Sequence, residues 1–146
     1  MSDLSPPPIP NLLEAKLGID TANLRTASFG DTRTLSDELN ALILKGKKTA
    51  SSGALDAYEE EGELPRIGEQ FLVIDYNEEP LCVIEITSVE QKRFLEVDAS
   101  FAAKEGEGDL SLAYWRAAHQ EFFERNNCFS EDMMLVCEEF KLVQVL

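Results

Sequence analysis

The sequence predicts a single α+β domain. Runs rich in β-forming residues occur at 71–74, 81–87, 93–97 and 134–145, and the two main helical segments lie outside the order of these runs. An alternating βαβ chain would instead place a helix between successive strands. The length of 146 residues, with 44% hydrophobic and 28% charged residues, is also typical of one globular domain.

Residues 1–24 are expected to form an N-terminal tail and a short helical arm. Four of the six prolines fall within the first ten residues, which is incompatible with a helix or a central strand there. Asn11 is placed to cap a short helix that ends at Gly18. The domain itself is therefore predicted to span residues 25–146.

The first strong helix is predicted from Thr34, which with Asp37 three residues later resembles a capping arrangement. Leucine and isoleucine side chains recur at helical spacing as far as Ile43, and Gly46 stands where a helix ends. Residues 46–53 then combine small hydroxyl side chains with lysines. This composition predicts a loop that enters an edge strand.

Residues 58–68 are predicted to form a solvated loop, because a run of glutamates is followed there by a proline and a glycine. The apolar runs at 71–74 and 81–87 flank the turn-forming residues 77–80. We expect these two runs to pair as a hairpin.

A second main helix is predicted between the strand segments at 93–97 and 134–145, which are expected to add two or more strands. The helix opens at Asp109 or Ser111, with Asp109 favoured as the N-cap. Its apolar side chains are spaced for one buried face. Trp115 lies on this face, so we interpret it mainly as a core residue.

The charge balance excludes a protein that binds long nucleic acids without sequence specificity. Acidic residues outnumber basic residues 28 to 13, and the net charge of −15 repels polyanions such as duplex DNA. Residues 25–48 are the exception, because five basic and three acidic residues give this window a net charge of +2. Such a window can take a phosphate or a short single strand, although basic residues at a helix end equally well complement the helix dipole.

The chain is predicted to be cytoplasmic. No apolar run reaches the length of a membrane span, and the N-terminus lacks the pattern of a signal peptide. Three cysteines without a C-x-x-C spacing support neither a disulfide framework nor a zinc site.

Taken in order along the chain, several segments resemble the ASCH domain family, as a stand-alone bacterial member: Phe29–Asp31, Gly46–Ser51, Leu81–Thr87, and Lys104–Asp109 followed by Ser111–Arg116. The resemblance implies a PUA-like small β-barrel flanked by helices. It also implies a cleft where the second and fourth segments meet. The family is linked to RNA binding, and some bacterial members resemble ribonucleases or amidohydrolases that deacylate N4-acetylcytidine.

Three residues are candidate catalytic groups. Lys48 follows a helix on a short loop, where an ammonium can contact phosphate or, when desolvated, act as a base. In the deacylating members of the family the nucleophile is a threonine three residues after the catalytic lysine, a position occupied here by Ser51. Glu107 matches the acid of the family's cleft. The alternative explanations are a solvated surface lysine and a solvated acidic loop.

Further residues are candidate substrate-binding groups. Adjacent lysines point to opposite sides of an extended chain, so at most one of Lys47 and Lys48 should enter the cleft. Hydroxyls beside the lysine can bind substrate or satisfy backbone groups, and an acid within an apolar strand faces either the cleft or solvent. Tyrosine and arginine can stack on bases or contact phosphates. The full set is Lys47, Thr49, Ser52, Tyr58, Glu85, Arg93, Glu105 and Arg116.

The leading hypothesis is an RNA-binding protein that hydrolyses single-stranded RNA as a ribonuclease. Lys48 would contact phosphate or act as the base, while Glu105 and Glu107 would position a proton or a divalent cation. Because His119 is the only histidine, chemistry by a histidine pair is excluded.

Two other functions remain open from the sequence. The first is a metal-independent amidohydrolase that acts on a nucleoside of the N4-acetylcytidine type, with Ser51 as the nucleophile. A net charge of −15 suits a small neutral nucleoside at least as well as RNA. The second is a non-catalytic module that binds RNA or a modified nucleotide. No cofactor is implied beyond a divalent cation for RNA cleavage, and no metal ligands are assigned.

Overall fold

The computed structural model describes residues 24–146. The helical arm and nearly all of the tail predicted for residues 1–24 lie outside this part of the chain. Within it, helices accompany a mostly antiparallel sheet, which confirms the α+β prediction. Among the described helices, none combines the length and apolar character that a bilayer span requires.

Five strands form one mixed sheet: β1 (Arg25–Ala27), β2 (Ala50–Ala54), β3 (Gln70–Ile74), β4 (Pro80–Arg93) and β5 (Met134–Val145). Their order in the sheet is β1-β3-β4-β5-β2. Only β1 and β3 run parallel, and the other neighbouring pairs are antiparallel. The pairing of β3 with β4 confirms the predicted hairpin, and β2 is an edge strand, as expected.

Within residues 24–146 the sheet is not closed, so the small β-barrel implied by the family resemblance is wrong for this part of the chain. β1 and β2 occupy opposite edges of the sheet and do not pair with each other. The two edge strands have only three and five residues, whereas β4 and β5 have 14 and 12. The register between β4 and β5 is irregular at two points, and such irregularities bend long strands.

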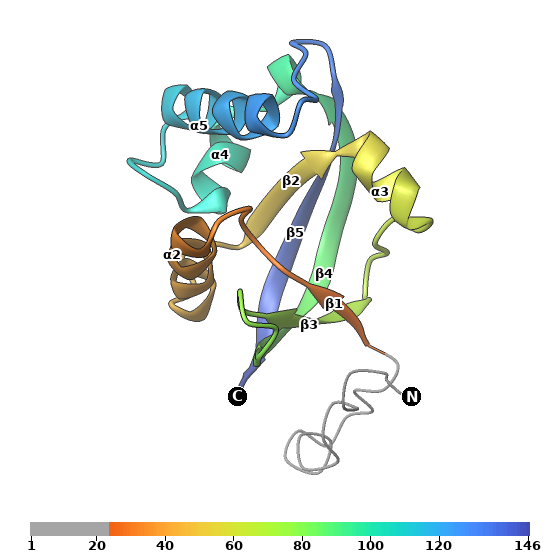
Figure 1. The fold of residues 1–146 in the computed structure, drawn as a ribbon, viewed down its shortest axis with the longest axis vertical. Helices are drawn as coiled ribbons and strands as arrows, with labels where there is room; N and C mark the ends of the chain where they lie inside the picture. The colour runs from red at the N-terminus through yellow and green to blue at the C-terminus, as the bar shows by residue number, and fades with distance from the viewer. Residues whose placement is uncertain (1–23) are drawn as a thin grey trace.

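Four α-helices and one 3-10 helix complete the described fold: α2 (Arg33–Leu44), α3 (Leu55–Glu61), η2 (Phe94–Glu96), α4 (Ala99–Glu105) and α5 (Leu112–Arg125). Figure 1 shows α2, α4 and α5 gathered along one side of the strands, while α3 follows β2 on the other side. The two helices of the sequence prediction correspond to α2 and α5. Neither α4 nor β1 was predicted.

Two apolar clusters hold the helices on the sheet. In the first, Ile43 of α2 packs with side chains of β3 and β4 such as Ile84. In the second, Phe123 of α5 packs with side chains of α4, β2 and β5 such as Leu135. All four residues are almost completely buried. Side chains of both clusters, such as Leu39 and Phe123, also line a cavity.

The caps of the two main helices differ from the prediction. The N-cap of α2 is Thr32, whose hydroxyl accepts a hydrogen bond from a backbone N–H of the first turn, so Thr34 lies inside the helix. For α5 the N-cap is Ser111 rather than Asp109, because the Asp109 carboxylate accepts from the backbone N–H of Ser111 instead. Gly46 has a φ of +77° just after α2, as expected of a helix stop.

Two further segment predictions are wrong. Residues 55–61 form α3, because leucine, alanine and glutamate are good helix formers, and the helix ends at Gly62 with a φ of +93°. The strand expected at residues 93–97 ends at its first residue. The chain then turns into a 3-10 helix, in which the Glu96 carboxylate accepts from the Arg93 backbone N–H.

Candidate functional site

A cavity of about 1060 Å³ opens between the two unpaired edges of the sheet. Both β1 and β2 contribute to its wall, together with side chains of α2, α3 and α5 and the loop after α4. It therefore occupies the place where a closed barrel would have its final strand pair. Its volume is large enough for a nucleoside-sized ligand.

Lys48 forms the floor of this cavity. The chain leaves α2 tightly, because the backbone N–H groups of Lys47 and Lys48 both donate to the Leu42 carbonyl, at 2.9 and 3.1 Å. This turn directs the Lys48 side chain inward, where only 2% of the residue is exposed. The neighbouring Lys47 is exposed, as expected for adjacent lysines in an extended chain.

The Lys48 ammonium is held by two carboxylates from the end of α4. Its Nζ donates to Glu105 Oε1 at 2.9 Å and to Glu107 Oε2 at 3.0 Å, with the Glu105 carbonyl oxygen at 3.4 Å. The Glu105 side chain is 1% exposed, whereas that of Glu107 is 18% exposed. Glu107 is therefore the carboxylate that a ligand in the cavity can reach.

Gly106 allows both carboxylates to face the same lysine. It has a φ of +76°, which reverses the chain after α4, and a Cβ at this position would overlap the Lys47 carbonyl. Glycine thus permits the close approach of the two backbones that carry Glu105 and Lys48.

Glu105 receives further hydrogen bonds on its second oxygen. Ser52 Oγ donates to Oε2 at 2.6 Å, and Trp115 Nε1 donates to it at 2.8 Å. Burial alone would raise the pKa of Glu105, but Lys48 and then His119 outweigh this effect and hold the pKa well below its usual range. Burial likewise opposes charge on Lys48, and the two carboxylates nevertheless raise its pKa. Both shifts favour the charged forms of Lys48 and Glu105.

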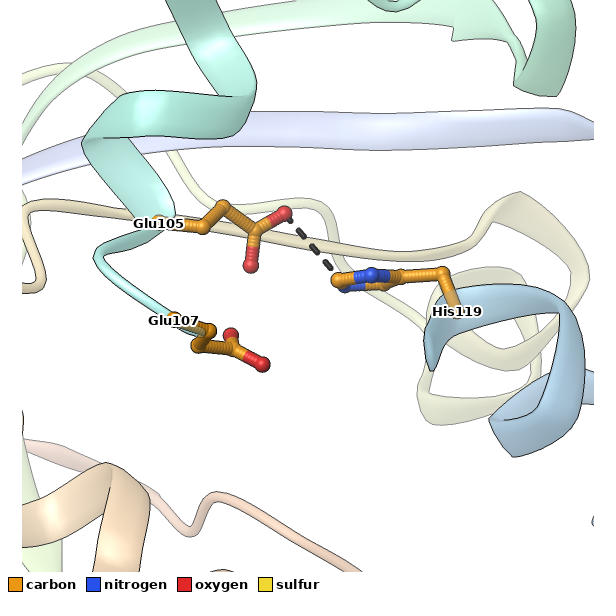
Figure 2. A group of neighbouring side chains, drawn as sticks. All are labelled: Glu105, Glu107 and His119. Carbon is orange, nitrogen blue, oxygen red and sulfur yellow. Dashed lines mark ion pairs between the residues drawn. The ribbon is translucent and has the colours of Figure 1, made fainter. Parts of the chain in front are cut away.

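His119 is the third polar group beside Glu105. Figure 2 shows its ring pointing toward the Glu105 carboxylate, and the distance from Nε2 to Oε2 is 3.5 Å. The ring stacks on Trp115 with a centroid separation of 4.2 Å, and Nδ1 lies 2.9 Å from the Trp115 carbonyl oxygen. Burial lowers the pKa of His119, but the carboxylates of Glu105 and Glu107 raise it by more, so the net shift is upward.

A second polar pair lies on another part of the cavity wall. Tyr58 of α3 donates a hydrogen bond from its hydroxyl to Glu138 Oε2 at 3.1 Å. Glu138 belongs to β5 and lies directly across from Ser51 of β2. Burial of Glu138, which is 8% exposed, raises its pKa to about 7.

Glu105, Glu107 and His119 form a cluster of potential metal ligands. One potential ligand atom from each residue lies within 4.8 Å of the others (Figure 2). However, the Lys48 ammonium contacts both carboxylates at about the distance of a hydrogen bond, and a divalent cation there would be repelled by this charge. These residues therefore fit an ammonium better than a metal ion.

The structure brings six of the predicted site residues to one cavity. The three candidate catalytic residues and three of the candidate binding residues line it: Lys48, Ser51, Ser52, Tyr58, Glu105 and Glu107. The alternation along β2 separates the two serines, because Ser52 turns toward Glu105 while Ser51 shares a face with Glu138.

The other five predicted binding residues lie away from this cavity. Lys47 borders a smaller hollow of about 390 Å³, which Gly106 also lines. Thr49 Oγ1 donates to the Lys104 carbonyl, and Glu85 pairs with Gln70 and Lys141. The two arginines donate to backbone carbonyls, Arg93 to that of Asp132 and Arg116 to those of Leu95 and Val97.

Sequence reasoning missed His119 and Glu138 as site residues and interpreted Trp115 mainly as a core residue. A signal for the first existed, because His119 follows Trp115 by four residues and such spacing puts both on one helix face. Glu138 interrupts the apolar run at 135–137, and an acid in a buried strand needs a partner.

The comparisons with known proteins agree with this fold. The family model of the ASCH domain matches residues 25–144. The crystal structure of an ASCH domain from Lactobacillus crispatus is 37% identical, with a TM-score of 0.76, over 93% of this chain and 87% of that chain. A crystal structure of a protein from Enterococcus faecalis V583 is 33% identical, with a TM-score of 0.80, over 92% of this chain and 85% of that chain. Among curated proteins, nothing matches the chain.

Proposed function

The chain belongs to the ASCH domain family, and we propose that it is a metal-independent amidohydrolase that deacylates a small neutral nucleoside of the N4-acetylcytidine type. The observation that carries the proposal is Lys48, buried between Glu105 and Glu107 at the floor of a cavity that also exposes Ser51. Lys48 and Ser51 line the same cavity, and a lysine can act as the base that activates a hydroxyl as a nucleophile.

The charge of the cavity favours a neutral substrate over RNA. Seven acidic and three basic side chains line it, in addition to His119. Each of the three cations already contacts a carboxylate, Arg25 that of Glu69, Arg125 that of Asp31, and Lys48 those of Glu105 and Glu107. The cavity is therefore negative, and among its described lining residues every cation is already paired with a carboxylate. Such a cavity disfavours the binding of a phosphate. Cleavage of single-stranded RNA stays a prediction that the assay below also tests.

In the proposed reaction Ser51 attacks the acyl carbonyl. Lys48 is charged at rest, so it first passes a proton to Glu107, a transfer that becomes favourable when the ligand excludes water from the cavity. The neutral amine then takes the proton of the Ser51 hydroxyl as its oxygen bonds to the acyl carbon. The C–N bond breaks, and Lys48 returns this proton to the leaving nitrogen.

Water completes the proposed cycle. It attacks the acyl ester on Ser51 and gives one proton through Lys48 to the departing serine oxygen. The products are the deacylated nucleoside and a carboxylic acid, and the Lys48–Glu107 pair recovers its charges. Glu105 stays ionised throughout, because Lys48, Ser52 and Trp115 all donate to it.

A direct assay separates the candidate functions. The purified protein is incubated with N4-acetylcytidine and, separately, with single-stranded RNA, each with and without a chelator. We expect hydrolysis of the nucleoside that is insensitive to the chelator, with kcat reduced about 100-fold or more by Ser51→Ala. Lys104→Met serves as the control, because Lys104 forms an exposed ion pair with Glu139 outside the cavity.

Two results would reject the amidohydrolase. Cleavage of RNA that Glu107→Gln abolishes, without nucleoside turnover, would support the ribonuclease instead. Absence of both reactions, with retained binding of either ligand, would support a non-catalytic binding module.

A further inference from the structure

The pair formed by Tyr58 and Glu138 has no part in the proposed proton transfers, yet it lies on the wall of the same cavity. The two residues come from different elements, α3 and β5, and join through the hydrogen bond from the tyrosine hydroxyl to Glu138 Oε2. Tyr58 reaches Glu138 because Gly53 lies beneath its ring. A Cβ at Gly53 would come within 2.8 Å of the tyrosine ring.

One oxygen of Glu138 remains available to a ligand. Oε2 accepts from Tyr58, whereas Oε1 makes no hydrogen bond to any residue in the described part of the chain. Among the described residues, the buried polar atoms that lack a hydrogen-bond partner do not include Oε1. Solvent therefore reaches this oxygen. It therefore opens into the cavity from a residue that is 92% buried, given its 8% exposure.

The surroundings of Glu138 allow its carboxyl group to carry a proton near neutral pH. Burial is the largest influence and raises its pKa to about 7, with Glu105 of α4 adding to this effect. The Tyr58 hydrogen bond, Lys48 at the entry to β2 and Arg25 of β1 lower it. Glu61 of α3 acts on the same pair through Tyr58.

We propose that Glu138, held by Tyr58, recognises the ring of the substrate by donating a hydrogen bond from its protonated carboxyl group to a ring nitrogen or ring carbonyl oxygen of a pyrimidine nucleoside. The inference rests on the proposed function for the class of substrate. It adds a specificity residue that binds the neutral ring, separate from the groups that act on the acyl bond.

The position of Glu138 relative to Ser51 supports this assignment. The two residues are directly paired across β2 and β5, so their side chains lie on the same face of the sheet about 5 Å apart at Cβ. In an N4-acylated cytosine the ring nitrogen N3 is close to the acyl group. A ring held at Glu138 therefore presents its acyl carbon on the Ser51 side. A carboxylic acid also offers a donor beside an acceptor, which matches the ring nitrogen and the adjacent N–H of such a base.

The test is the pH dependence of binding of cytidine, which is the reaction product and is not consumed. Its affinity is measured by calorimetry between pH 6 and 8.5, a range in which cytidine itself does not titrate. For the wild type we expect a constant Kd up to about pH 7 and a Kd that rises by up to about tenfold per pH unit above it. In Glu138→Gln, whose amide donates at every pH, Kd should not change across the range.

Two further variants make the test specific. Glu139→Gln is the matched control, since this neighbour on β5 pairs with Lys104 outside the cavity, and it should keep the wild-type profile. Tyr58→Phe removes a hydrogen bond that lowers the pKa of Glu138, so the rise in Kd should shift to higher pH. Circular dichroism establishes that each variant is folded.

The inference is overturned if the wild-type Kd is independent of pH, or if Glu138→Gln keeps the wild-type profile, which would place the titrating group elsewhere, for example at His119. Absence of cytidine binding by the folded wild type at pH 6 overturns it as well. If cytidine binds with the expected profile but N4-acetylcytidine is not hydrolysed, the inference stands and the proposed hydrolase activity fails.

Discussion

Lys48 Nζ lies 2.9 Å from Glu105 Oε1, although 57 residues separate them in the chain and both side chains are 1% exposed. This ion pair joins the entry of β2 to the end of α4 in the interior of the protein. Burial of two charges is costly, and the cost is offset here because Ser52 and Trp115 also donate to the carboxylate. The stability of the fold and the chemistry of the cavity therefore depend on the same contact.

Removing the ammonium should destabilise the protein strongly. Lys48→Met leaves Glu105 buried without its counter-ion, and we expect a loss of about 3–5 kcal/mol in the free energy of unfolding. Lys104→Met removes an exposed ion pair and should cost about 0–1 kcal/mol. Urea denaturation of both variants measures the difference. Equal losses in the two variants would contradict the described burial of Lys48.

The turn after α4 should be intolerant of a side chain. Gly106 and Gly62 both follow a helix with positive φ, but only at Gly106 would a Cβ overlap another backbone, that of Lys47. We expect Gly62→Ala to cost about 1 kcal/mol and Gly106→Ala about 2–5 kcal/mol, because the second adds a clash to the same strain. Denaturation midpoints measure both. A cost at Gly106 no larger than at Gly62 would show that the two backbones do not approach closely.

The titration of His119 can be followed through the single tryptophan. Trp115 stacks on the His119 ring, and a protonated imidazole quenches indole emission more than the neutral ring does. Burial lowers the pKa of His119, but Glu105 and Glu107 together raise it by more, so the fluorescence midpoint should lie above the ordinary value of 6.5. Glu105→Gln should move the midpoint downward. A midpoint below 6.5 in the wild type would mean that burial dominates instead.

The stability of the protein should fall as pH rises through the titration of Glu138. Its pKa is about 7 in the folded protein and about 4.5 when unfolded, so between these values the folded state binds more protons. The free energy of unfolding therefore decreases from pH 4.5 to pH 7, by at most about 3 kcal/mol. The contribution of His119 to the free energy of unfolding also decreases as pH rises, because its pKa is raised. The quantity to measure is therefore the difference in the free energy of unfolding between the wild type and Glu138→Gln. A constant difference across this window would refute the raised pKa of Glu138.

The mainly antiparallel core could be predicted from local patterns. Whether the sheet closes into a barrel could not be predicted in this way. Alternating apolar runs identify the hairpin of β3 and β4, and helical spacing identifies α2 and α5, because these signals are local. Whether β1 meets β2 depends instead on strand length and on the bending of β4 and β5. The three residues of β1 give too short a pattern to identify a strand at all.

The site was predictable where the sequence carries a motif. Lys48 and Glu107 were paired through the family resemblance, and the structure places their charged groups 3.0 Å apart. Glu138 and His119 carry no such motif, and only tertiary packing brings them to the cavity. Arg116 was predicted to bind substrate and does not line the cavity. Its guanidinium donates instead to two backbone carbonyls near η2.

The most direct test of the central claim is the rate of N4-acetylcytidine hydrolysis by the wild type and by Glu107→Gln, in the presence of a chelator. Glu107 is the more exposed partner of Lys48, so this variant is expected to fold even where Lys48→Met does not. We expect measurable turnover by the wild type and a decrease of about 100-fold or more in kcat for Glu107→Gln, with Lys104→Met unchanged. Equal rates for Glu107→Gln and the wild type, or no turnover by the wild type, would contradict the proposal that this cavity deacylates a neutral nucleoside.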